Sequence, residues 1–264
     1  MKLKINAYAK LNLFLDILGR RDDGYHEVLT KMCLIDLTDD VTLCVTDGGG
    51  VTGADSDNTA YKAAELFLKT LGVKRRVDIK ITKRIPVMAG LGGSSADAAA
   101  VLRGLNTLFD EPFTLHELMQ TGAKIGADVP FCVHGGCALC KGTGTEVAEI
   151  FPLPDCVFAI VKPDFDCSTK EAYALYAANP PPKTQRHEEK IYNVFEKLYG
   201  NPEIEKIKAD FMKLGASGAS MTGSGSAVFG VFAGVRQAEK ALSGMDYTQK
   251  FIARPVGATL CGRP

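Results

Sequence analysis

Residues 86–106 carry the stretch that decides the fold, PVMAGLGGSSADAAAVLRGLN, in which glycines and serines precede an alanine-rich run with helical spacing. Gly90, Gly92 and Gly93 allow positive φ angles and let the backbone come close to a ligand. Ser94 and Ser95 offer hydroxyls, and the helix start adds free N–H groups with about half a positive charge. The stretch therefore predicts a polyphosphate site, although a plain glycine turn capped by serine is the simpler alternative.

A catalytic lysine has to come from elsewhere in the chain, because no G-x-x-x-x-G-K-[ST] motif occurs in it. Lys10, in YAKLNLFLDI, is the candidate. A lysine on an apolar strand needs a carboxylate or phosphate partner if it is buried. The alternative is an edge-strand lysine that lies in solvent.

The carboxylate candidate is Asp128, in IGADVPF, where apolar neighbours favour a partly closed pocket. This aspartate either caps a helix or accepts a proton from an alcohol beside Lys10. Positioned proton transfer contributes on the order of 10²–10⁴ in rate. A nearby lysine would keep the carboxylate ionised and offset charge on a moving phosphoryl group.

Composition favours a small charged ligand over a macromolecular one. The 31 basic and 31 acidic residues of this 264-residue chain cancel, which argues against nucleic acid and anionic membranes as partners. No signal-peptide core or membrane span is apparent. The single C-x-x-C, Cys137 to Cys140, lies in a strand-like run, so we expect core cysteines and no metal site. We predict a reduced, cytoplasmic protein, monomeric or weakly homodimeric.

The chain mixes strands and helices without a strict βαβ rhythm, which predicts an α+β protein. Strands are expected over 1–50, a flexible hairpin connection at 48–53, and helices near 58–72, 95–109 and 114–126. The second half predicts helices near 168–178, 188–199 and 203–214. Two prolines in FPLPD suggest a seam, hence two domains, 1–152 and 153–264.

Two glycine motifs resemble those of the GHMP small-molecule kinases. PVMAGLGGSSADAAA resembles their second motif, and MTGSGSAVFGVF, residues 221–232, resembles their third. AYAKLNLFLDILGRRDDGYHEV and GADVPFCVHGGCALCKGTGTEV are similar to the branch whose substrate is a methylerythritol that carries a cytidine diphosphate. The resemblance covers about residues 5–260. It implies a domain like ribosomal protein S5 domain 2, followed by a ferredoxin-like domain.

The resemblance also implies an activity, the ATP-dependent phosphorylation of the methylerythritol 2-hydroxyl in the non-mevalonate route to isoprenoids. Lys10 and Asp128 would be the catalytic pair, and Mg²⁺ would arrive with the nucleotide. The residues expected to wrap the ATP phosphates are Pro86, Val87, Met88, Ala89, Gly90, Leu91, Gly92, Gly93, Ser94, Ser95 and Ala96. Asn58 and Lys83 would lie beside adenine.

For the second substrate, the resemblance places Asn12 near the methylerythritol and Tyr25 with His26 at the cytosine. Thr169 and Tyr173 fall where the family lines its cytidine pocket. An aromatic face and edge-directed hydrogen bonds suit a pyrimidine. From the residues alone, a tyrosine packed at a turn and a solvent-exposed histidine are an equally good interpretation of the Tyr25–His26 pair.

The family loop more often reads G-L-G-G-G-S-S-D, so the serine pair here lies one position nearer the glycines. Either Ser94 or Ser95 would therefore meet phosphate or Mg²⁺. Two alternatives stay open: another GHMP kinase, acting on mevalonate, homoserine or a sugar, and a nucleotide-binding module without catalysis. Gly-Tyr-His argues against the first alternative, because those substrates carry no nucleobase. Lys10 with Asp128 argues against the second.

Overall fold

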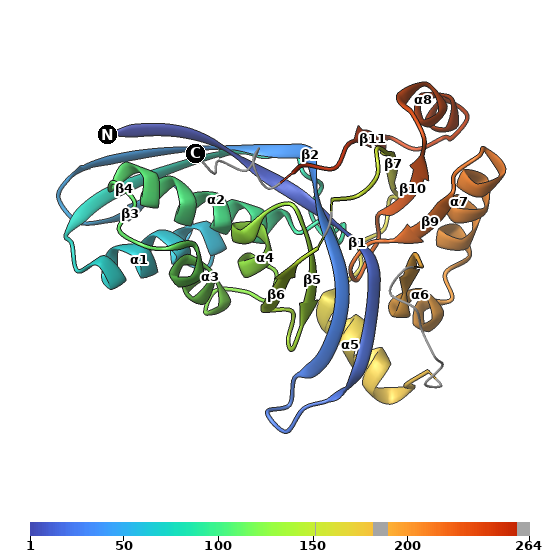
Figure 1. Ribbon diagram of the computed structural model, residues 1–264, viewed down its shortest axis with the longest axis horizontal. Coiled ribbons are helices and arrows are strands. Elements are labelled where there is room, and N and C mark those ends of the chain that lie inside the picture. Colours follow the sequence, from blue (N-terminus) through green and yellow to red (C-terminus); the bar gives the residue numbers. More distant parts are fainter. Residues whose placement is uncertain (151, 182–189, 258–264) are drawn as a thin grey trace.

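Two long antiparallel strands, β1 (Lys2–Arg20) and β2 (His26–Asp47), run side by side through the centre of the molecule (Figure 1). The structure, a computed structural model, describes residues 1–150, 152–181 and 190–257. Lys10 lies opposite Leu34, and Asn12 lies opposite Met32. Since side chains alternate along a strand, Lys10 and Asn12 point to one face of the sheet and Leu11 to the other.

The first sheet has seven strands among the described residues, in the order β3-β4-β2-β1-β8, with β5 on β2 and β6 on β5. The bounds are β3 Gly50–Thr52, β4 Arg75–Thr82, β5 Cys137–Lys141, β6 Glu146–Glu149 and β8 Tyr192–Asn193. The hairpin connection predicted at 48–53 is wrong, because β3 pairs parallel with β4. Just after β3, Gly53 lies against the backbone of β4, and a β-carbon at Gly53 would lie 2.0 Å from Ile79 O. Only glycine therefore lets the chain come this close to β4.

Four helices accompany this sheet: α1 Thr59–Leu71, α2 Gly93–Leu108, α3 Leu115–Ala123 and α4 Val129–His134. α1 ends as predicted at Gly72, whose φ is 72°. Thr114 and Glu117 form a capping box at the start of α3, where the helix predicted near 114–126 begins. α2 packs against β1 and β2, where Gly104 lies close to Ile5 and Leu43, and α1 lies against α2. The Ala-rich run of the sequence is thus a core helix.

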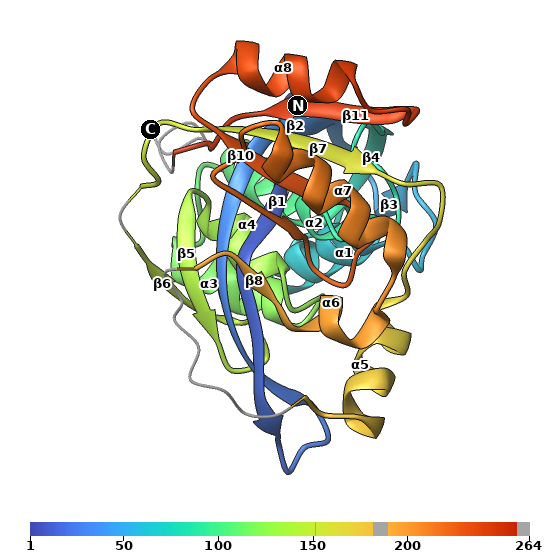
Figure 2. The same cartoon turned by 90° about the vertical axis from the view of Figure 1, so that its right-hand side faces the viewer.

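The second sheet is antiparallel in the order β11-β7-β10-β9. Its strands are β7 Val157–Lys162, β9 Gly218–Met221, β10 Val228–Phe232 and β11 Gln249–Ala253; its helices are α7 Pro202–Lys213 and α8 Val235–Ser243. α7 packs on β9 and β10, and α8 packs on β7, β10 and β11 (Figure 2). The chain order β-α-β-β-α-β is ferredoxin-like. The predicted α+β fold class is confirmed.

Two further helices, α5 (Thr169–Ala178) and α6 (Val194–Tyr199), lie together beside the β1–β2 hairpin (Figure 1). The helix predicted over 188–199 is therefore shorter: residues 188 and 189 lie outside the described part, and Tyr192–Asn193 pairs with β1 before α6 begins. Because β8 crosses to the first sheet, the two halves are linked by a strand. The boundary between residues 152 and 153 stays a prediction.

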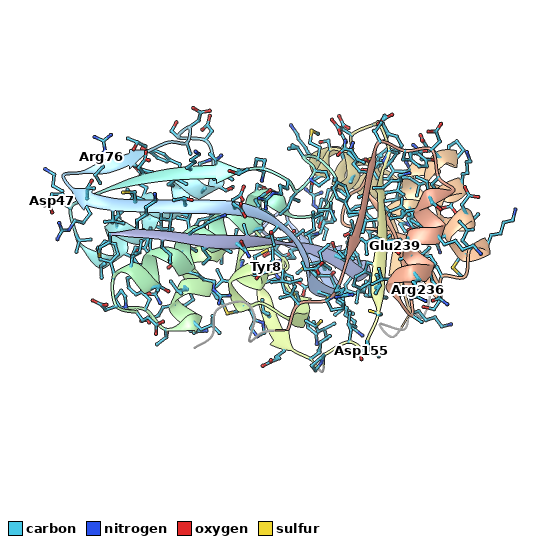
Figure 3. All side chains as sticks on the ribbon, turned by 90° about the horizontal axis from the view of Figure 1, so that it is seen from above. Tyr8, Asp47, Arg76, Asp155, Arg236 and Glu239 are labelled. Carbon is cyan, nitrogen blue, oxygen red and sulfur yellow. The ribbon has the colours of Figure 1, made fainter. Side chains whose placement is uncertain are left out.

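Seen from above, the molecule has two lobes (Figure 3). Asp47 and Arg76 mark the far end of the first sheet, and Arg236 and Glu239 lie on α8 at the other end. Each lobe has its own apolar core, and Phe158 and Phe229 of the second sheet join the core of the first. In the described part of the chain, no helix combines the length and the apolar character that a membrane crossing requires.

Candidate active site

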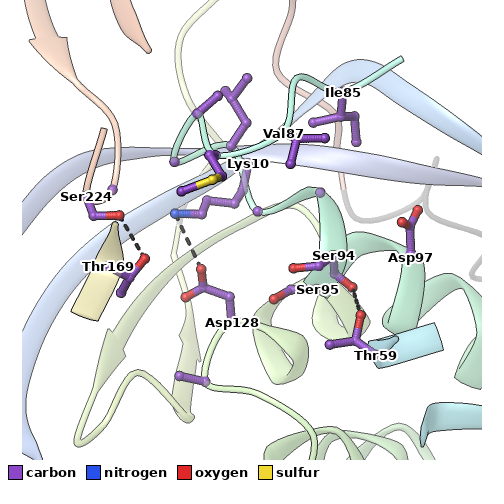
Figure 4. A pocket seen from close by; sticks show the side chains of 18 of the residues that line it. Lys10, Thr59, Ile85, Val87, Ser94, Ser95, Asp97, Asp128, Thr169 and Ser224 are labelled. Carbon is purple, nitrogen blue, oxygen red and sulfur yellow. Dashed lines mark hydrogen bonds and ion pairs between the residues drawn. The ribbon is translucent and has the colours of Figure 1, made fainter. Parts of the chain in front are cut away.

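A cavity of about 1320 Å³ lies where the two lobes meet, and both glycine-rich segments line it. β1 and β2 supply Lys10, Asn12 and Thr30 to its wall, and the turn before α4 supplies Asp128. The second lobe adds Thr169, Tyr173 and the loop 223–225. Figure 4 shows Lys10, Asp128 and Ser95 around this space, although they are far apart in the sequence.

Lys10 is buried, so the alternative of a solvent-exposed lysine is wrong. Its side chain is 4% exposed, and Nζ lies 3.4 Å from Asp128 Oδ2 (Figure 4). The same ammonium donates a hydrogen bond to Asn12 Oδ1. A buried ammonium needs such partners, and a phosphate could take part in the same arrangement.

Asp128 stands at the N-cap position of α4, but its side chain makes no capping hydrogen bond. Its side chain is 35% exposed and faces the cavity. The carboxylate is thus held by Lys10 and open toward a ligand, which is the state that proton transfer from an alcohol requires.

The two glycine-rich segments touch each other beside Lys10. A β-carbon on Gly90 would lie 2.1 Å from Thr222 O, and one on Gly92 would lie 2.9 Å from Lys10 Cγ. Backbone hydrogen bonds join Lys10 N–H to Leu91 O at 2.9 Å and Ala227 N–H to Ala89 O at 3.1 Å. Glycine is needed here because backbones approach one another as well as a ligand.

The start of α2 offers uncapped N–H groups to the cavity. Its N-cap residue is Gly92, with a φ of 71° and no side-chain cap. Ser94 and Ser95 line the cavity, and Thr59 Oγ1 donates to the Ser94 carbonyl at 2.7 Å (Figure 4). Since the first N–H groups of a helix have no partner inside the helix, they suit an anion.

All residues predicted around the ATP phosphates line the cavity except Ala96, which is buried in the core. Asn58 and Lys83, predicted beside adenine, line it too. The side chain of Asn58 also caps α1 by accepting from Ala60 N–H at 2.8 Å.

Lys83 and two buried aspartates form a charge network beside the segment that leads into the glycine loop, which the sequence did not predict. Lys83 donates to Asp39 and, at 2.7 Å, to Asp97 Oδ2. Asp39 also accepts from Ile85 N–H at 2.8 Å, so one carboxylate fixes the turn that leads into the loop. Burial raises the pKa of Asp97 to about 6, while the Lys83 ammonium opposes the shift. Asp97 could not be picked out from the sequence, because an aspartate in an Ala-rich helix gives no indication of a role until Lys83 and Asp39 are seen beside it.

Asn12 lies at the floor of the cavity in a fixed orientation. Its side-chain amide donates to Thr30 Oγ1 at 2.8 Å, and its backbone N–H donates to Thr222 Oγ1 at 3.0 Å. Thr222 Oγ1 in turn donates to Gly90 O at 3.3 Å. Sequence reasoning did not assign a role to Thr30 or Thr222, although Thr222 lies in the second glycine-rich segment.

The residues predicted for cytidine separate into two groups. Tyr173 and Thr169 line the cavity, and Thr169 Oγ1 lies 2.9 Å from Ser224 Oγ (Figure 4). Tyr25 and His26 are not among the lining residues. The His26 and Tyr173 rings are nevertheless in contact, with centroids 5.1 Å apart and planes tilted by 30°. Tyr25 lies at the hairpin tip with 67% of its surface exposed.

The chain matches two family descriptions that together define a class of enzymes. GHMP kinases N terminal domain matches residues 58–136, and GHMP kinases C terminal matches residues 183–248. The homoserine kinase from Cytophaga hutchinsonii, at 19% identity and a TM-score of 0.74 over 97% of this chain and 96% of that one, shares the fold. The chain is a GHMP kinase, an ATP-dependent small-molecule kinase as the sequence predicted.

More similar proteins narrow the class to one family. The 4-diphosphocytidyl-2-C-methyl-D-erythritol kinase of Clostridium botulinum is 40% identical over 96% of this chain and 100% of its own length. The same kinase of a Geobacillus species is 41% identical over 88% of each chain. A crystal structure of 4-(cytidine 5'-diphospho)-2C-methyl-D-erythritol kinase superposes with a TM-score of 0.82 at 32% identity, over 97% of this chain and 100% of that one. The chain belongs to the 4-diphosphocytidyl-2-C-methyl-D-erythritol kinase family.

Proposed function

We propose that this protein transfers the γ-phosphoryl group of ATP to the 2-hydroxyl of 4-diphosphocytidyl-2-C-methyl-D-erythritol, in non-mevalonate isoprenoid biosynthesis. The observation that carries the proposal is the 3.4 Å contact between Lys10 Nζ and Asp128 Oδ2 at the cavity lined by the glycine loop. A site that only binds nucleotides does not need a carboxylate such as Asp128, placed beside an ammonium and open to the cavity. The sequence identity of about 40% to the kinases named above supports the choice of substrate.

In this proposal Asp128 accepts the proton of the 2-hydroxyl as the oxygen attacks the γ-phosphorus. Lys10 forms an ion pair with this carboxylate, with Nζ 3.4 Å from Oδ2, and so holds it in place. The same ammonium offsets the charge that spreads over the moving phosphoryl group. The hydrogen bond to Asn12 limits the freedom of Lys10, so little has to reorganise during the transfer.

The uncapped start of α2 and the hydroxyls of Ser94 and Ser95 would hold the triphosphate. In the described part of the chain, no cluster of three His, Cys, Asp or Glu side chains is arranged to hold a metal ion. Mg²⁺ commonly binds through substrate phosphates and only one or two protein groups. The hydroxyls of Ser94 and Ser95 fit an ion that enters with the nucleotide, where it would neutralise phosphate charge.

For the second substrate, we propose Asn12 for the methylerythritol and Tyr25, His26, Thr169 and Tyr173 for the cytidine. The contact of His26 with Tyr173, which lines the cavity, supports an aromatic wall for the pyrimidine. We further propose a cytoplasmic enzyme that is monomeric or weakly homodimeric. Free cysteines throughout the described residues support a reducing compartment.

The test is release of ADP from ATP with the cytidine diphosphate substrate, with mevalonate and with homoserine, on the same enzyme preparation. We expect ADP only with the first. ADP formed only with mevalonate or homoserine would overturn the substrate assignment while leaving the kinase assignment intact. Nucleotide binding without ADP from any of the three acceptors would favour a binding module.

A further inference from the structure

Two cysteines of neighbouring strands lie side by side on the first sheet, outside the catalytic cavity. Cys33 of β2 and Cys137 of β5 are register partners, and their sulfurs are 3.1 Å apart. Both are buried, with Cys33 at 0% and Cys137 at 7% exposure. Neither residue takes part in the proposed phosphoryl transfer.

The backbone places this pair at the kind of position that a disulfide can bridge. Leu34 N–H donates to Gly136 O at 2.9 Å, so the next pair along the ladder, Cys33 with Cys137, is a non-hydrogen-bonded pair. In such pairs the Cα atoms are about 4.5 Å apart. Disulfides span Cα separations of about 4.4–6.8 Å, so a bond needs only side-chain rotation and a small approach of the strands.

Three groups around Cys137 stabilise its thiolate. The hydrogen-bond contact with Cys33 is the largest of the causes that lower the pKa of Cys137 to about 7, and the Leu153 backbone N–H and the Lys31 ammonium act in the same direction. The pKa of Cys33 is raised by the same contact and by burial. The Leu153 N–H and the Lys31 ammonium act on Cys137 and not on Cys33, so Cys137 ionises more readily and is the more reactive sulfur of the pair.

Two of the groups that act on Cys137 border a second cavity. Lys31 and Leu153 line a second cavity of about 520 Å³, together with Cys156. Cys33 lies opposite Leu11 of β1. Because side chains alternate along a strand, Leu11 and Cys33 face the side of the sheet opposite to Lys10 and Asn12. A modification here would not enter the ATP cavity.

We propose that Cys33 and Cys137 are a modification site, at which a peroxide converts the two thiols to a cross-strand disulfide. The Cys137 thiolate attacks one peroxide oxygen, the O–O bond breaks, and the released hydroxide takes a proton to become water. The Cys33 sulfur then attacks the sulfenic sulfur of Cys137, the S–OH bond breaks, and a second water leaves with the Cys33 proton. Both sulfurs are oxidised and the peroxide is reduced.

The test is peptide mapping of the full-length protein after exposure to hydrogen peroxide, blocking of free thiols and digestion without reductant. We expect a peptide pair joined through Cys33 and Cys137 that dithiothreitol separates. A Cys137 link to Cys156, or sulfinic acid on Cys137 with Cys33 still a free thiol, would overturn the proposal. This measurement needs no variant, so it does not depend on how a substituted core folds.

Variants give a second readout. In Cys33→Ala the resolving thiol and the contact that lowers the Cys137 pKa are both missing. We therefore expect no cross-strand disulfide, and a sulfenic acid on Cys137, trapped by dimedone, that forms more slowly than the disulfide does in the parent. The matched control is Cys44→Ala, in the same strand but remote from the pair, which should form the disulfide like the parent protein. We also expect oxidation to raise the thermal midpoint of the parent and of Cys44→Ala, and not of Cys33→Ala. A rise in all three would contradict the assignment.

Discussion

Gly92 and Lys10 are in direct contact: a β-carbon added to Gly92 would lie 2.9 Å from Lys10 Cγ and 3.1 Å from Cε. The glycine-rich loop and Lys10 are therefore one packed unit, although 82 positions separate Gly92 from Lys10 in the sequence (92 − 10). Since Lys10 Nζ also contacts Asp128, a shift of the loop moves the proposed base as well.

Gly92→Ala is expected to lower turnover at least tenfold, because the new methyl group displaces Lys10. The positive φ of 71° adds backbone strain of about 1–2 kcal/mol. Gly72→Ala is the matched control: its φ is 72°, and nothing lies within 4 Å of the added carbon. Steady-state ADP release and thermal midpoints separate the effects. Equal losses of turnover in both variants would mean that strain alone is responsible.

Asp128→Asn is expected to keep ATP affinity and to lower turnover by about a hundredfold or more, because the amide cannot accept the proton. The matched control is Asp246→Asn, an exposed aspartate before β11. Nucleotide titration and ADP release measure the two quantities. Parallel loss of affinity and turnover would assign Asp128 a structural role instead.

Asp97→Asn is expected to change how stability depends on pH. The pKa of Asp97 is raised from 3.8 to about 6, chiefly by burial, so the folded protein binds this proton more tightly than the unfolded chain does. Its contribution to the free energy of unfolding is therefore largest below pH 4 and declines as the pH rises through 6. The free energy of unfolding of Asp97→Asn, relative to that of the parent, should therefore increase as the pH rises from 4 to 6.

Urea unfolding at several pH values measures this difference. Asp97→Asn also loses the ion pair with Lys83. Above pH 6 this loss lowers the free energy of unfolding by a constant amount, and it does not change the sign of the expected pH dependence. Asp246→Asn serves again as the control and should show a flat difference. A flat difference for Asp97→Asn would show that this carboxylate does not titrate there.

Tyr25→Ala is expected to raise KM for the cytidine diphosphate substrate and to leave KM for ATP unchanged. Tyr25 lies at the tip of the β1–β2 hairpin beside His26, whose ring contacts Tyr173. Tyr173→Ala is the companion variant, since Tyr173 lines the cavity directly. If Tyr173→Ala alone raised this KM, the cytidine site would exclude the hairpin tip.

Much of the local structure could be predicted from sequence, where the cause is itself local. Gly72 ends α1 and the Thr114 capping box starts α3 because these signals act within a few residues. The short strands β3 and β8 were missed, because three and two residues become strands only when a partner such as β4 or β1 is beside them. Pairing partners of that kind are set by the tertiary fold.

The sequence by itself determined the glycine-rich loop, the class of enzyme and the choice of Lys10 and Asp128 as candidate catalytic residues. Glycines, serines and single charges within apolar segments can be recognised in the sequence without knowing the fold. Only the tertiary structure decided that these two side chains meet at 3.4 Å, that Asp39 and Asp97 share Lys83, and that Cys33 faces Cys137. The physical reason is that burial and Coulomb interactions depend on distances in space. Those distances are set by strand register and lobe packing.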